Sequence, residues 1–293
     1  MSKYSIKELE KLSGIKAHTI RIWEKRYNIV APQRTITNIR YYSDDDLKKI
    51  INVSLLNNSG LKISKIADLS SKELVNKVSE LSETKSSADI HIDQLIVAMV
   101  DLDEENFDHI LSGLIERYGF ERTIITIVYA FLQKIGVLWQ TGNITPAQEH
   151  FISNLIRQKI IVAIDSVPLA PKNRPRALLF LPEAELHELG LLFYHYLVKK
   201  AGFRTYYLGQ MVPFNDVEAL CQSHDPKVLI TAITSSPDSQ SVQEYLNRLC
   251  KEQPQRTILA TGQILRKMAI KIPSNLHVFN TPNDLKGLLN SIK

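Results

Sequence analysis

The spacing of apolar positions changes along the chain and divides it into three segments. Through residue 81, apolar residues recur at helical spacing in short runs separated by glycine and polar turns. From 90 to 166 the helical spacing continues, with almost no strand signal. Beyond prolines 168, 171 and 175, short apolar runs alternate with helical stretches. The pattern predicts a multidomain chain, with domains at 1–81, 90–166 and 176–293.

The first segment predicts a helix-turn-helix followed by a small wing. Ser5 and Glu8 have the spacing of a capping box, in front of a short helix that ends at Ser13-Gly14. A second helix follows at 17–27, and two short helices joined by a tight turn form a helix-turn-helix. The alternating 36-ITNIRYY-42 suits a two-stranded wing. After the wing we expect a helix that runs to about Asn57, then a helix at roughly 62–81, and then a polar linker at 82–89.

The middle segment predicts a compact four-helix bundle. Three apolar stripes mark its first three helices, the last of them running from Ile124 to Trp139. The fourth helix begins at Thr145-Pro146, with Thr145 as cap and Gln148 closing a capping box. Four helices with short connections are typical of a bundle.

The last segment predicts an α/β domain with a parallel sheet. Short apolar runs of β type are each followed by a helical stretch, and the runs are 177–181, 205–209, 228–233, 257–261 and 277–279. Strands that alternate with helices in this way form an open parallel sheet, buried on both faces, of the flavodoxin-like or Rossmann-like kind.

Composition and charge narrow the class of protein. With 44% apolar and 23% charged residues, the chain of 293 residues is typical of a globular protein. No run approaches 18 apolar residues, and the charged start lacks the apolar core of a signal peptide, so we expect a cytoplasmic protein without membrane contact. The two cysteines, Cys221 and Cys250, are expected to be reduced.

The positive charge is concentrated at the start of the chain. Residues 1–42 hold nine lysines and arginines against three glutamates, which gives a charge of +6. The whole chain has a net charge of +5, so the remaining residues carry −1. A basic block of this kind suits the binding of nucleic-acid phosphates, although a solvated basic face is the alternative.

The rim of the predicted sheet holds the candidate chemistry. In an open α/β sheet, ligands bind beyond the carboxyl ends of the strands. His187 follows the first strand, with the Glu185 carboxylate two residues before it to hold one ring nitrogen. Taken alone, His187 could also be a surface residue at the start of a helix. No cysteine or second histidine lies nearby to complete a zinc site, which favours a metal held by its own macrocycle and needing one axial protein ligand.

These rim residues resemble the cobalamin-binding domain, whose pattern is Asp-x-His-x-x-Gly, then Ser-x-Leu and Gly-Gly. The chain has 185-ELHELG-190, then 231-TAI-233, and then Gly262-Gln263 with only half of the last motif. The resemblance implies that His187 is the lower axial ligand of cobalt, in place of the cofactor's own nucleotide base. It also implies that Glu185 bonds His187, that Gly190 leaves room for the nucleotide tail, and that Thr231 and Gly262 contact the cofactor. Gln263 departs from the motif.

The bundle carries a second resemblance, to the helical cap over cobalamin in CarH-type photoreceptor regulators. The spacing Trp-x9-Glu-His is present as Trp139, Glu149 and His150. The resemblance implies that all three face the upper side of the cofactor. It also implies that this cofactor is adenosylcobalamin. The alternative is a core tryptophan beside the first turn of a helix, where glutamate is favoured by the helix dipole.

The first segment resembles the MerR family of winged-helix regulators, on 19-TIRIWEKRYNIVAPQRT-35 and 40-RYYSDDDL-47. The resemblance implies that the second helix enters the major groove of double-stranded DNA and that the wing meets the backbone. By position, the groove-facing residues are His18, Thr19 and Arg21, and the backbone contacts are Arg26, Arg34, Arg40 and Tyr41. Trp23 is expected in the core. Asn38 and Ile39 stand where a wing glycine is common.

All three segments together resemble CarH-type regulators, which implies a DNA-binding repressor that senses cobalamin, and light, through changes in oligomeric state. No heptad run follows residue 81, so we expect the C-terminal domains to form the homo-oligomer. No paired carboxylates or nucleophile triad suggest an enzyme. One alternative is a DNA-binding regulator whose sensory domain has lost cobalamin and acts through protein contacts, which Gln263 favours. A corrinoid carrier is a further alternative, against which the winged helix argues.

Overall fold

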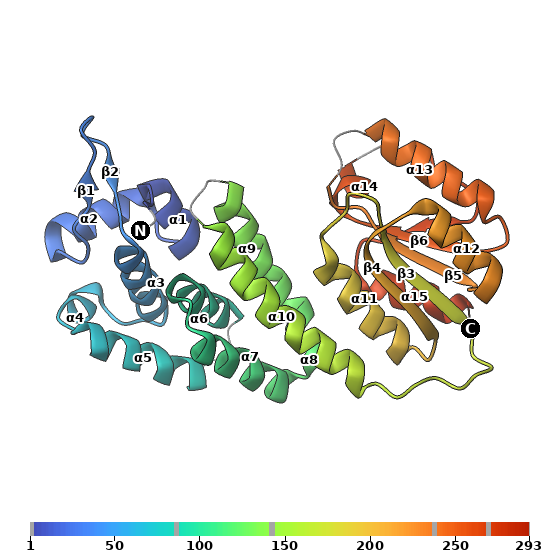
Figure 1. Ribbon diagram of the computed structural model, residues 1–293. Coiled ribbons are helices and arrows are strands. Elements are labelled where there is room, and N and C mark those ends of the chain that lie inside the picture. Colours follow the sequence, from blue (N-terminus) through green and yellow to red (C-terminus); the bar gives the residue numbers. More distant parts are fainter. Residues whose placement is uncertain (1–2, 85–87, 141–143, 236–238, 268–270, 293) are drawn as a thin grey trace. The chain divides into compact units, whose positions relative to one another are not determined.

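The structure is a computed structural model that describes residues 3–84, 88–140, 144–235, 239–267 and 271–292 (Figure 1). The chain divides into two compact units, Met1–Leu155 and Ile156–Lys293. The division falls inside one helix, α10, Pro146–Ser166. None of the helices in the described ranges is long and apolar enough to cross a membrane.

The first unit opens with the predicted helix-turn-helix and wing. Helices α1, Ile6–Ser13, and α2, Ala17–Tyr27, are joined by a turn in which Gly14 has a φ of 71°. The Ser5 N–H donates to the Glu8 carboxylate at 2.5 Å, as the capping box predicts. Strands β1, Gln33–Arg34, and β2, Arg40–Tyr41, pair antiparallel, and α3, Asp44–Asn58, follows.

The prediction of one helix at 62–81 was wrong. Two helices occupy this stretch, α4, Ile63–Ala67, and α5, Ser71–Thr84. Ser70 starts the second, because its N–H donates to the Glu73 carboxylate at 2.8 Å while the Glu73 N–H donates to the Ser70 hydroxyl at 3.3 Å. The predicted linker at 82–89 was too long, since α5 runs to Thr84 and the next helix begins at Ala88.

The predicted third helix of the bundle contains a stretch of π-helix. The bundle is formed by α6, Ala88–Asp101, by α7, Glu104–Tyr118, by the consecutive α8, Phe120–Thr123, η1, Ile124–Val128, and α9, Tyr129–Gln140, and by the start of α10. Thr145 caps α10 with Gln148 as predicted, and the Gln148 amide reaches the Val100 carbonyl at 3.4 Å. Buried Asp93 of α6 pairs with Lys134 of α9 at 2.8 Å.

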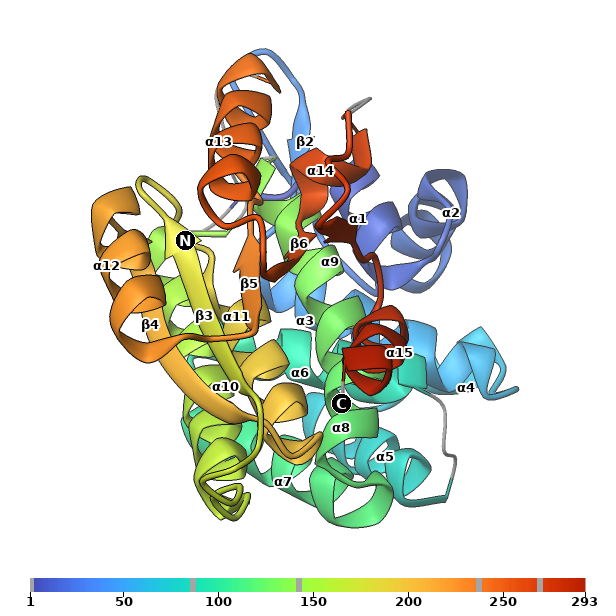
Figure 2. The ribbon, with the colours of Figure 1, turned by 90° about the vertical axis from the view of Figure 1, so that its right-hand side faces the viewer.

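The second unit contains the predicted parallel sheet (Figure 2). Its strands are β3, Arg176–Pro182, β4, Arg204–Val212, β5, Val228–Ala232, β6, Thr257–Thr261, and β7, Leu276–Val278. All pair in parallel, in the order β4-β3-β5-β6-β7. The order reverses between β3 and β5, which opens a crevice at the carboxyl ends of these two strands.

Helices cover both faces of the sheet (Figure 1). On one face lie α12, Phe214–His224, and α13, Ser239–Glu252, whose apolar residues join those of the strands in one buried cluster. On the other lie α11, Glu188–Lys200, and α15, Pro282–Ile292, which contact each other. The short α14, Gln263–Lys267, follows β6 directly. Strands β3, β5 and β6 are buried almost throughout, which explains why they appear in the sequence as continuous apolar runs.

Candidate functional site

Glu185 joins the two loops that border the crevice of the sheet. Only 1% of the residue is exposed. One carboxylate oxygen accepts the backbone N–H groups of Thr234 and Ser235, after β5, at 2.6 and 2.8 Å. The other accepts the backbone N–H of His187 at 3.0 Å and lies 2.6 Å from its ring Nδ1. Glu185 therefore fixes His187 in place and ties the loop after β3 to the loop after β5.

The electrostatics of this pair set the chemistry of the histidine. Burial by itself raises the pKa of Glu185, but the hydrogen bonds from His187, Ser235 and Thr234 outweigh burial and lower that pKa to about 2. The carboxylate is thus ionised at neutral pH and can only accept a hydrogen bond from the Nδ1–H of His187. In the neutral tautomer that makes this bond, the lone pair lies on Nε2. The His187 side chain, at the start of α11, is 58% exposed. A carboxylate that orients an accessible imidazole is the usual environment of a histidine metal ligand.

The two glycines of the rim, Gly262 and Gly190, differ in whether the fold itself requires glycine at the position. At Gly262, with a φ of 134°, a Cβ would lie 1.9 Å from the Ile233 carbonyl oxygen, so the fold itself requires glycine there. At Gly190, a Cβ would meet only the Tyr194 ring, at 3.9 Å. The packing of the chain does not require glycine at 190, and its absent side chain leaves room beside His187 for a ligand.

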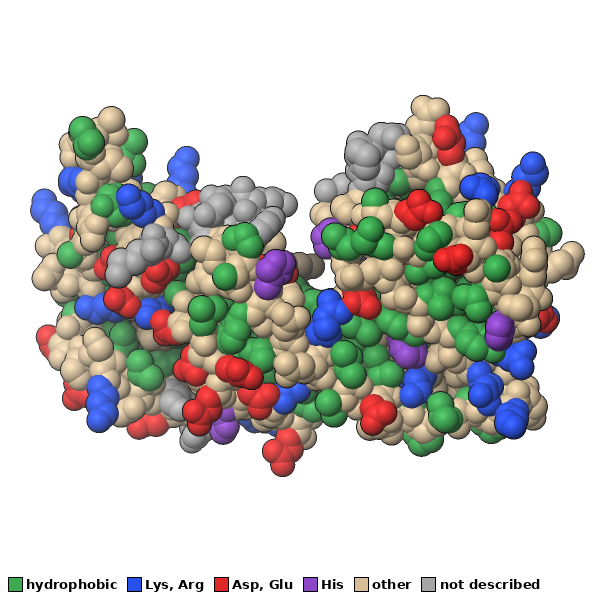
Figure 3. Space-filling model, viewed as in Figure 1, with side chains coloured by type: hydrophobic (Ala, Val, Ile, Leu, Met, Phe, Trp, Pro, Cys, Tyr) green, Lys and Arg blue, Asp and Glu red, His purple; other side chains and the backbone are tan. Residues whose placement is uncertain are grey.

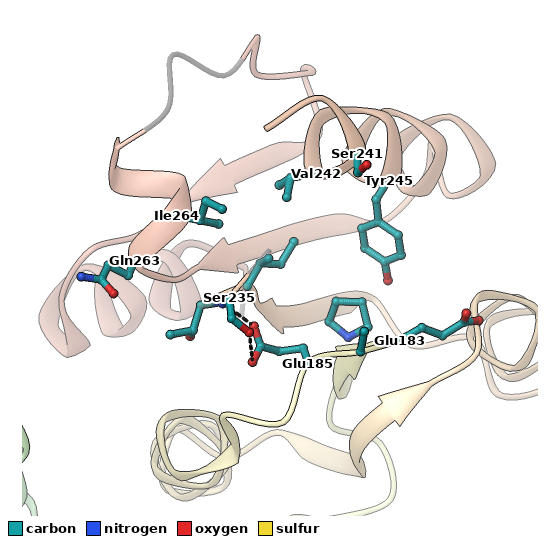
Figure 4. Close-up of a pocket in the computed structure, with 12 residues that line it drawn as sticks. Glu183, Glu185, Ser235, Ser241, Val242, Tyr245, Gln263 and Ile264 are labelled. Atoms are coloured by element: carbon teal, nitrogen blue, oxygen red, sulfur yellow. Dashed lines mark hydrogen bonds between the residues drawn. The ribbon is translucent and has the colours of Figure 1, made fainter. Parts of the chain in front are cut away.

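A pocket of about 620 Å³ opens between this rim and helix α13. Gln263 lies at its edge with its amide directed away from Tyr245, so the glutamine does not fill the pocket (Figure 4). Thr231 is fully buried in β5, and its hydroxyl has no hydrogen-bond partner among the described residues. A fully buried hydroxyl without a partner is uncommon in native proteins and suits a site that a ligand completes. The residues present at this rim therefore fit a corrinoid with one axial histidine.

Two rim residues to which the sequence assigned no role support the histidine loop. Glu188, next to His187, forms an ion pair with Arg157 of α10 and accepts the Tyr207 hydroxyl of β4 at 2.8 Å. The Gln210 amide donates to the Leu186 carbonyl at 2.7 Å. These contacts hold both flanks of His187. Glu188 was visible as a third glutamate near the histidine, but its partners lie far away in the sequence.

The three predicted residues of the helical cap lie in α9 and in the first part of α10. Glu149 and His150 occupy the first turn of α10 and pair at 3.0 Å, and the His150 side chain is 72% exposed. Glu149 also accepts the Ser153 hydroxyl at 2.6 Å. Trp139 belongs to α9, and its side chain lies outside the described residues.

The predicted DNA-contacting residues lie on α2 and the wing, where Figure 3 shows basic side chains at the surface. On α2, His18, Arg21 and Arg26 are exposed, and Thr19 is half-buried. Trp23 is buried, as predicted.

The wing residues are held by contacts within the wing and to α2. Arg34 is exposed and donates to the Asn38 side chain at 2.7 Å. Asn38 itself has a φ of 63° and supplies the left-handed residue that a glycine often provides. Arg40 is half-buried beside Glu24 at 3.4 Å, and the Tyr41 hydroxyl donates to Gln33 at 2.6 Å. His18, Arg21, Arg26 and Arg34 are thus the exposed residues among the predicted contacts.

Two family descriptions match the chain. A MerR HTH family regulatory protein matches residues 4–73, which contain the helix-turn-helix and the wing. A B12 binding domain matches residues 91–163, which contain the bundle helices with Trp139, Glu149 and His150.

Relatives of known name resemble the chain over most of its length. The HTH-type transcriptional repressor CarH of Myxococcus xanthus is 25% identical over 289 residues, which is 96% of each chain. The HTH-type transcriptional repressor CarA of the same organism is 26% identical over 254 residues, 85% of this chain and 84% of the relative. A solved structure, the monomethylamine corrinoid protein of Methanosarcina barkeri, has a TM-score of 0.56 at 14% identity, and covers 71% of this chain and 100% of its own. This last likeness shows the fold.

The fold and the comparisons together support a transcriptional regulator that joins a MerR-type helix-turn-helix to a B12-binding domain. Its similarity to CarH and CarA along most of the chain supports a CarH-type regulator, as the sequence motifs predicted.

Proposed function

We propose that the protein is a repressor that binds operator DNA through α2 and the wing and binds adenosylcobalamin through its later segments. The observation that carries the cofactor proposal is the pairing of ionised Glu185 with His187 Nδ1 at 2.6 Å, beside a glycine that the fold does not require. The relatives named as repressors support the regulatory role.

In this proposal His187 is the lower axial ligand of cobalt, and Glu185 holds its ring. Gly190, Thr231 and Gly262 border the cofactor. Trp139, Glu149 and His150 cover its upper side from the bundle. The chemistry that bound adenosylcobalamin supplies is a cobalt–carbon bond that light cleaves, which makes light the proposed signal. The proposed domains are 1–81, 90–166 and 176–293, and the C-terminal domains provide the proposed homo-oligomer contact.

The DNA-binding part of the proposal assigns two kinds of contact. His18, Thr19 and Arg21 of α2 face the major groove and read bases. Arg26, Arg34, Arg40 and Tyr41 contact the backbone and set the position of the protein without reading sequence. The basic block of residues 1–42, with its charge of +6, supplies the attraction to phosphate.

Gel filtration of the purified protein after incubation with adenosylcobalamin in the dark tests the cofactor proposal. We expect a pink protein peak. His187→Ala is expected to weaken binding or change the cobalt absorption spectrum, whereas His277→Ala, at an exposed position of β7, leaves both unchanged. A colourless wild-type peak would reject cobalamin binding and favour a regulator that acts through protein contacts alone. An unchanged spectrum of the His187 variant would remove its role as ligand.

A further inference from the structure

Tyr245 of helix α13 lines the pocket beside Glu185. The Tyr245 ring reaches into the pocket from α13 (Figure 4). It packs edge-to-face on Phe214, with ring centroids 5.8 Å apart. Its hydroxyl is buried and has no hydrogen-bond partner within the described part of the chain. Burial raises the pKa of Tyr245 above its usual range, so the hydroxyl keeps its proton and is available as a donor.

A second unpartnered hydroxyl lies on the same side of the sheet. Thr231 stands between Leu229 and Ile233 in β5, and both of these belong to the apolar cluster under α12 and α13. Because residues at i and i+2 of a strand face the same side, Thr231 lies on the Tyr245 side of the sheet. Buried hydroxyls normally find partners, so two without any on one side of the sheet point to a ligand that supplies acceptors.

The charge of the pocket restricts the part of a ligand that can enter. Glu183 and Glu185 are among its lining residues, and the described residues of the lining include no lysine or arginine. The remaining lining combines apolar residues with uncharged polar ones, and most of its surface is apolar: Pro182, Ala184, Ile233, Val242 and Ile264, with Thr234, Ser235, Ser241 and Gln263. Such surroundings disfavour a phosphate, which needs cationic or multiple N–H partners, and favour a flat, uncharged, mostly apolar group that carries an acceptor atom.

A heterocyclic base released from a metal is flat, uncharged and mostly apolar, and it carries an acceptor atom. If His187 occupies the lower position on cobalt, the base that a cobalamin carries there must leave the metal, and its ring nitrogen loses its partner. Given the corrinoid binding proposed above, we propose that the Tyr245 hydroxyl donates a hydrogen bond to the ring nitrogen of this displaced base. Tyr245 is then a specificity residue that favours corrinoids with a complete nucleotide and stabilises the state in which His187 has replaced the base.

Two corrinoids that differ only in the nucleotide separate this role from a structural one. Tyr245→Phe removes the hydroxyl and keeps the ring on Phe214. We expect its affinity for adenosylcobalamin to fall about 5- to 10-fold, the usual effect of losing one buried hydrogen bond. Its affinity for adenosylcobinamide, which lacks the nucleotide and base, is expected to stay at the wild-type value. The matched control is Tyr206→Phe, which removes a hydroxyl from a partly buried tyrosine packed against the same cluster, outside the pocket lining.

The stability of the cofactor-free protein gives an independent readout. Because the Tyr245 hydroxyl has no partner in the described structure, Tyr245→Phe is expected to leave the unfolding midpoint unchanged or raise it. Equal losses of affinity for both corrinoids, or no loss for either, would overturn the role of Tyr245. Failure of the wild-type protein to bind either corrinoid would instead reject the proposed function on which that role rests.

Discussion

Glu185 contributes to stability as well as to the site, and the two roles share one cause. Its pKa is about 2 in the folded protein against 4.5 for an ordinary glutamate. A carboxyl whose pKa is lowered by folding stabilises the protein above its unfolded pKa, and this contribution is lost as the pH falls through the folded pKa. The shift corresponds to about 3 kcal/mol at neutral pH.

Glu185→Gln is therefore expected to lower the free energy of unfolding by about 3 kcal/mol at pH 7. The difference from wild type is expected to hold down to about pH 4.5 and to shrink as the pH approaches about 2. Denaturant unfolding followed by circular dichroism at a series of pH values measures it. Glu183→Gln, at an exposed position of the same loop, is the control and is expected to have little effect. A loss of equal size at every pH would show that the carboxylate charge is not responsible.

Gly190 offers a test in which stability and binding move in opposite directions. A glycine inside a helix is destabilising, and position 190 has room for a Cβ. Gly190→Gln is expected to raise the free energy of unfolding by up to about 1 kcal/mol while it blocks cobalamin. Gly113→Gln in α7, where a Cβ meets nothing within 4 Å, is expected to give a similar gain without any loss of binding. Normal cobalamin binding by the Gly190 variant would place the cofactor away from this helix.

At the scale of elements, the sequence predicted best where burial imposes one pattern. Strand β5 is buried at every position from Val228 to Ala232, and a strand of this kind appears as a continuous apolar run. The prediction failed where apolar spacing continued across a break. Leu74 and Val78 continue the helical spacing of Ile63 and Ile66, although the capping box at Ser70 starts a new helix between them.

Within the site, contacts between residues close in the sequence could be predicted, and contacts between residues far apart in the sequence could not. Glu185 and His187 could be paired from the sequence, because only Leu186 separates them. The bonds from Glu185 to Thr234 and Ser235 span 49 and 50 residues, and no local pattern indicates them. Tyr245 was also missed, since a tyrosine on the apolar face of a helix has the same spacing whether it packs in the core or meets a ligand.

Removal of an arginine from α2 and removal of one from the wing are expected to weaken DNA binding in different ways. Arg21→Ala removes a proposed base contact and is expected to cost about 1–3 kcal/mol on the operator, with weaker discrimination against other sequences. Arg34→Ala removes a proposed phosphate contact and is expected to weaken binding to all DNA and reduce the salt slope by about 1. Mobility-shift titrations at several salt concentrations distinguish the two.

Lys77→Ala on α5, an exposed position outside the proposed interface, is the control for charge. It is expected to leave both the affinity and the salt slope nearly unchanged. If Arg21→Ala and Arg34→Ala affected operator and unrelated DNA alike, α2 would hold the backbone without reading bases.

At the scale of the whole molecule, the two proposed ligands bind to different segments of one chain. Within the first unit, the DNA-binding segment and the bundle are in direct contact. Lys48 of α3 donates to Asp101 of α6 at 2.6 Å, and the two helices pack together. A change in the bundle can therefore alter the environment of α3 without an intermediary.

Coupling between the two ligands has a thermodynamic signature that does not depend on the path. If adenosylcobalamin in the dark raises the affinity for operator DNA by some factor, operator DNA must raise the affinity for adenosylcobalamin by the same factor. We expect a factor of about 5–150, the usual range for allosteric coupling. Titrations of each ligand with and without the other, at one salt and protein concentration, measure both factors.

His187→Ala and illumination provide the two controls for this coupling. The variant is expected to bind DNA with the wild-type affinity in the absence of cofactor and to lose the enhancement, because the change removes only the proposed cobalt ligand on the second unit. Illumination is expected to abolish the enhancement in the wild-type protein by removing the intact cobalt–carbon bond. An enhancement that survives light would leave cobalamin as the signal and reject light. A factor of one in the dark would mean that DNA binding and cobalamin binding are independent, and that regulation passes through another partner.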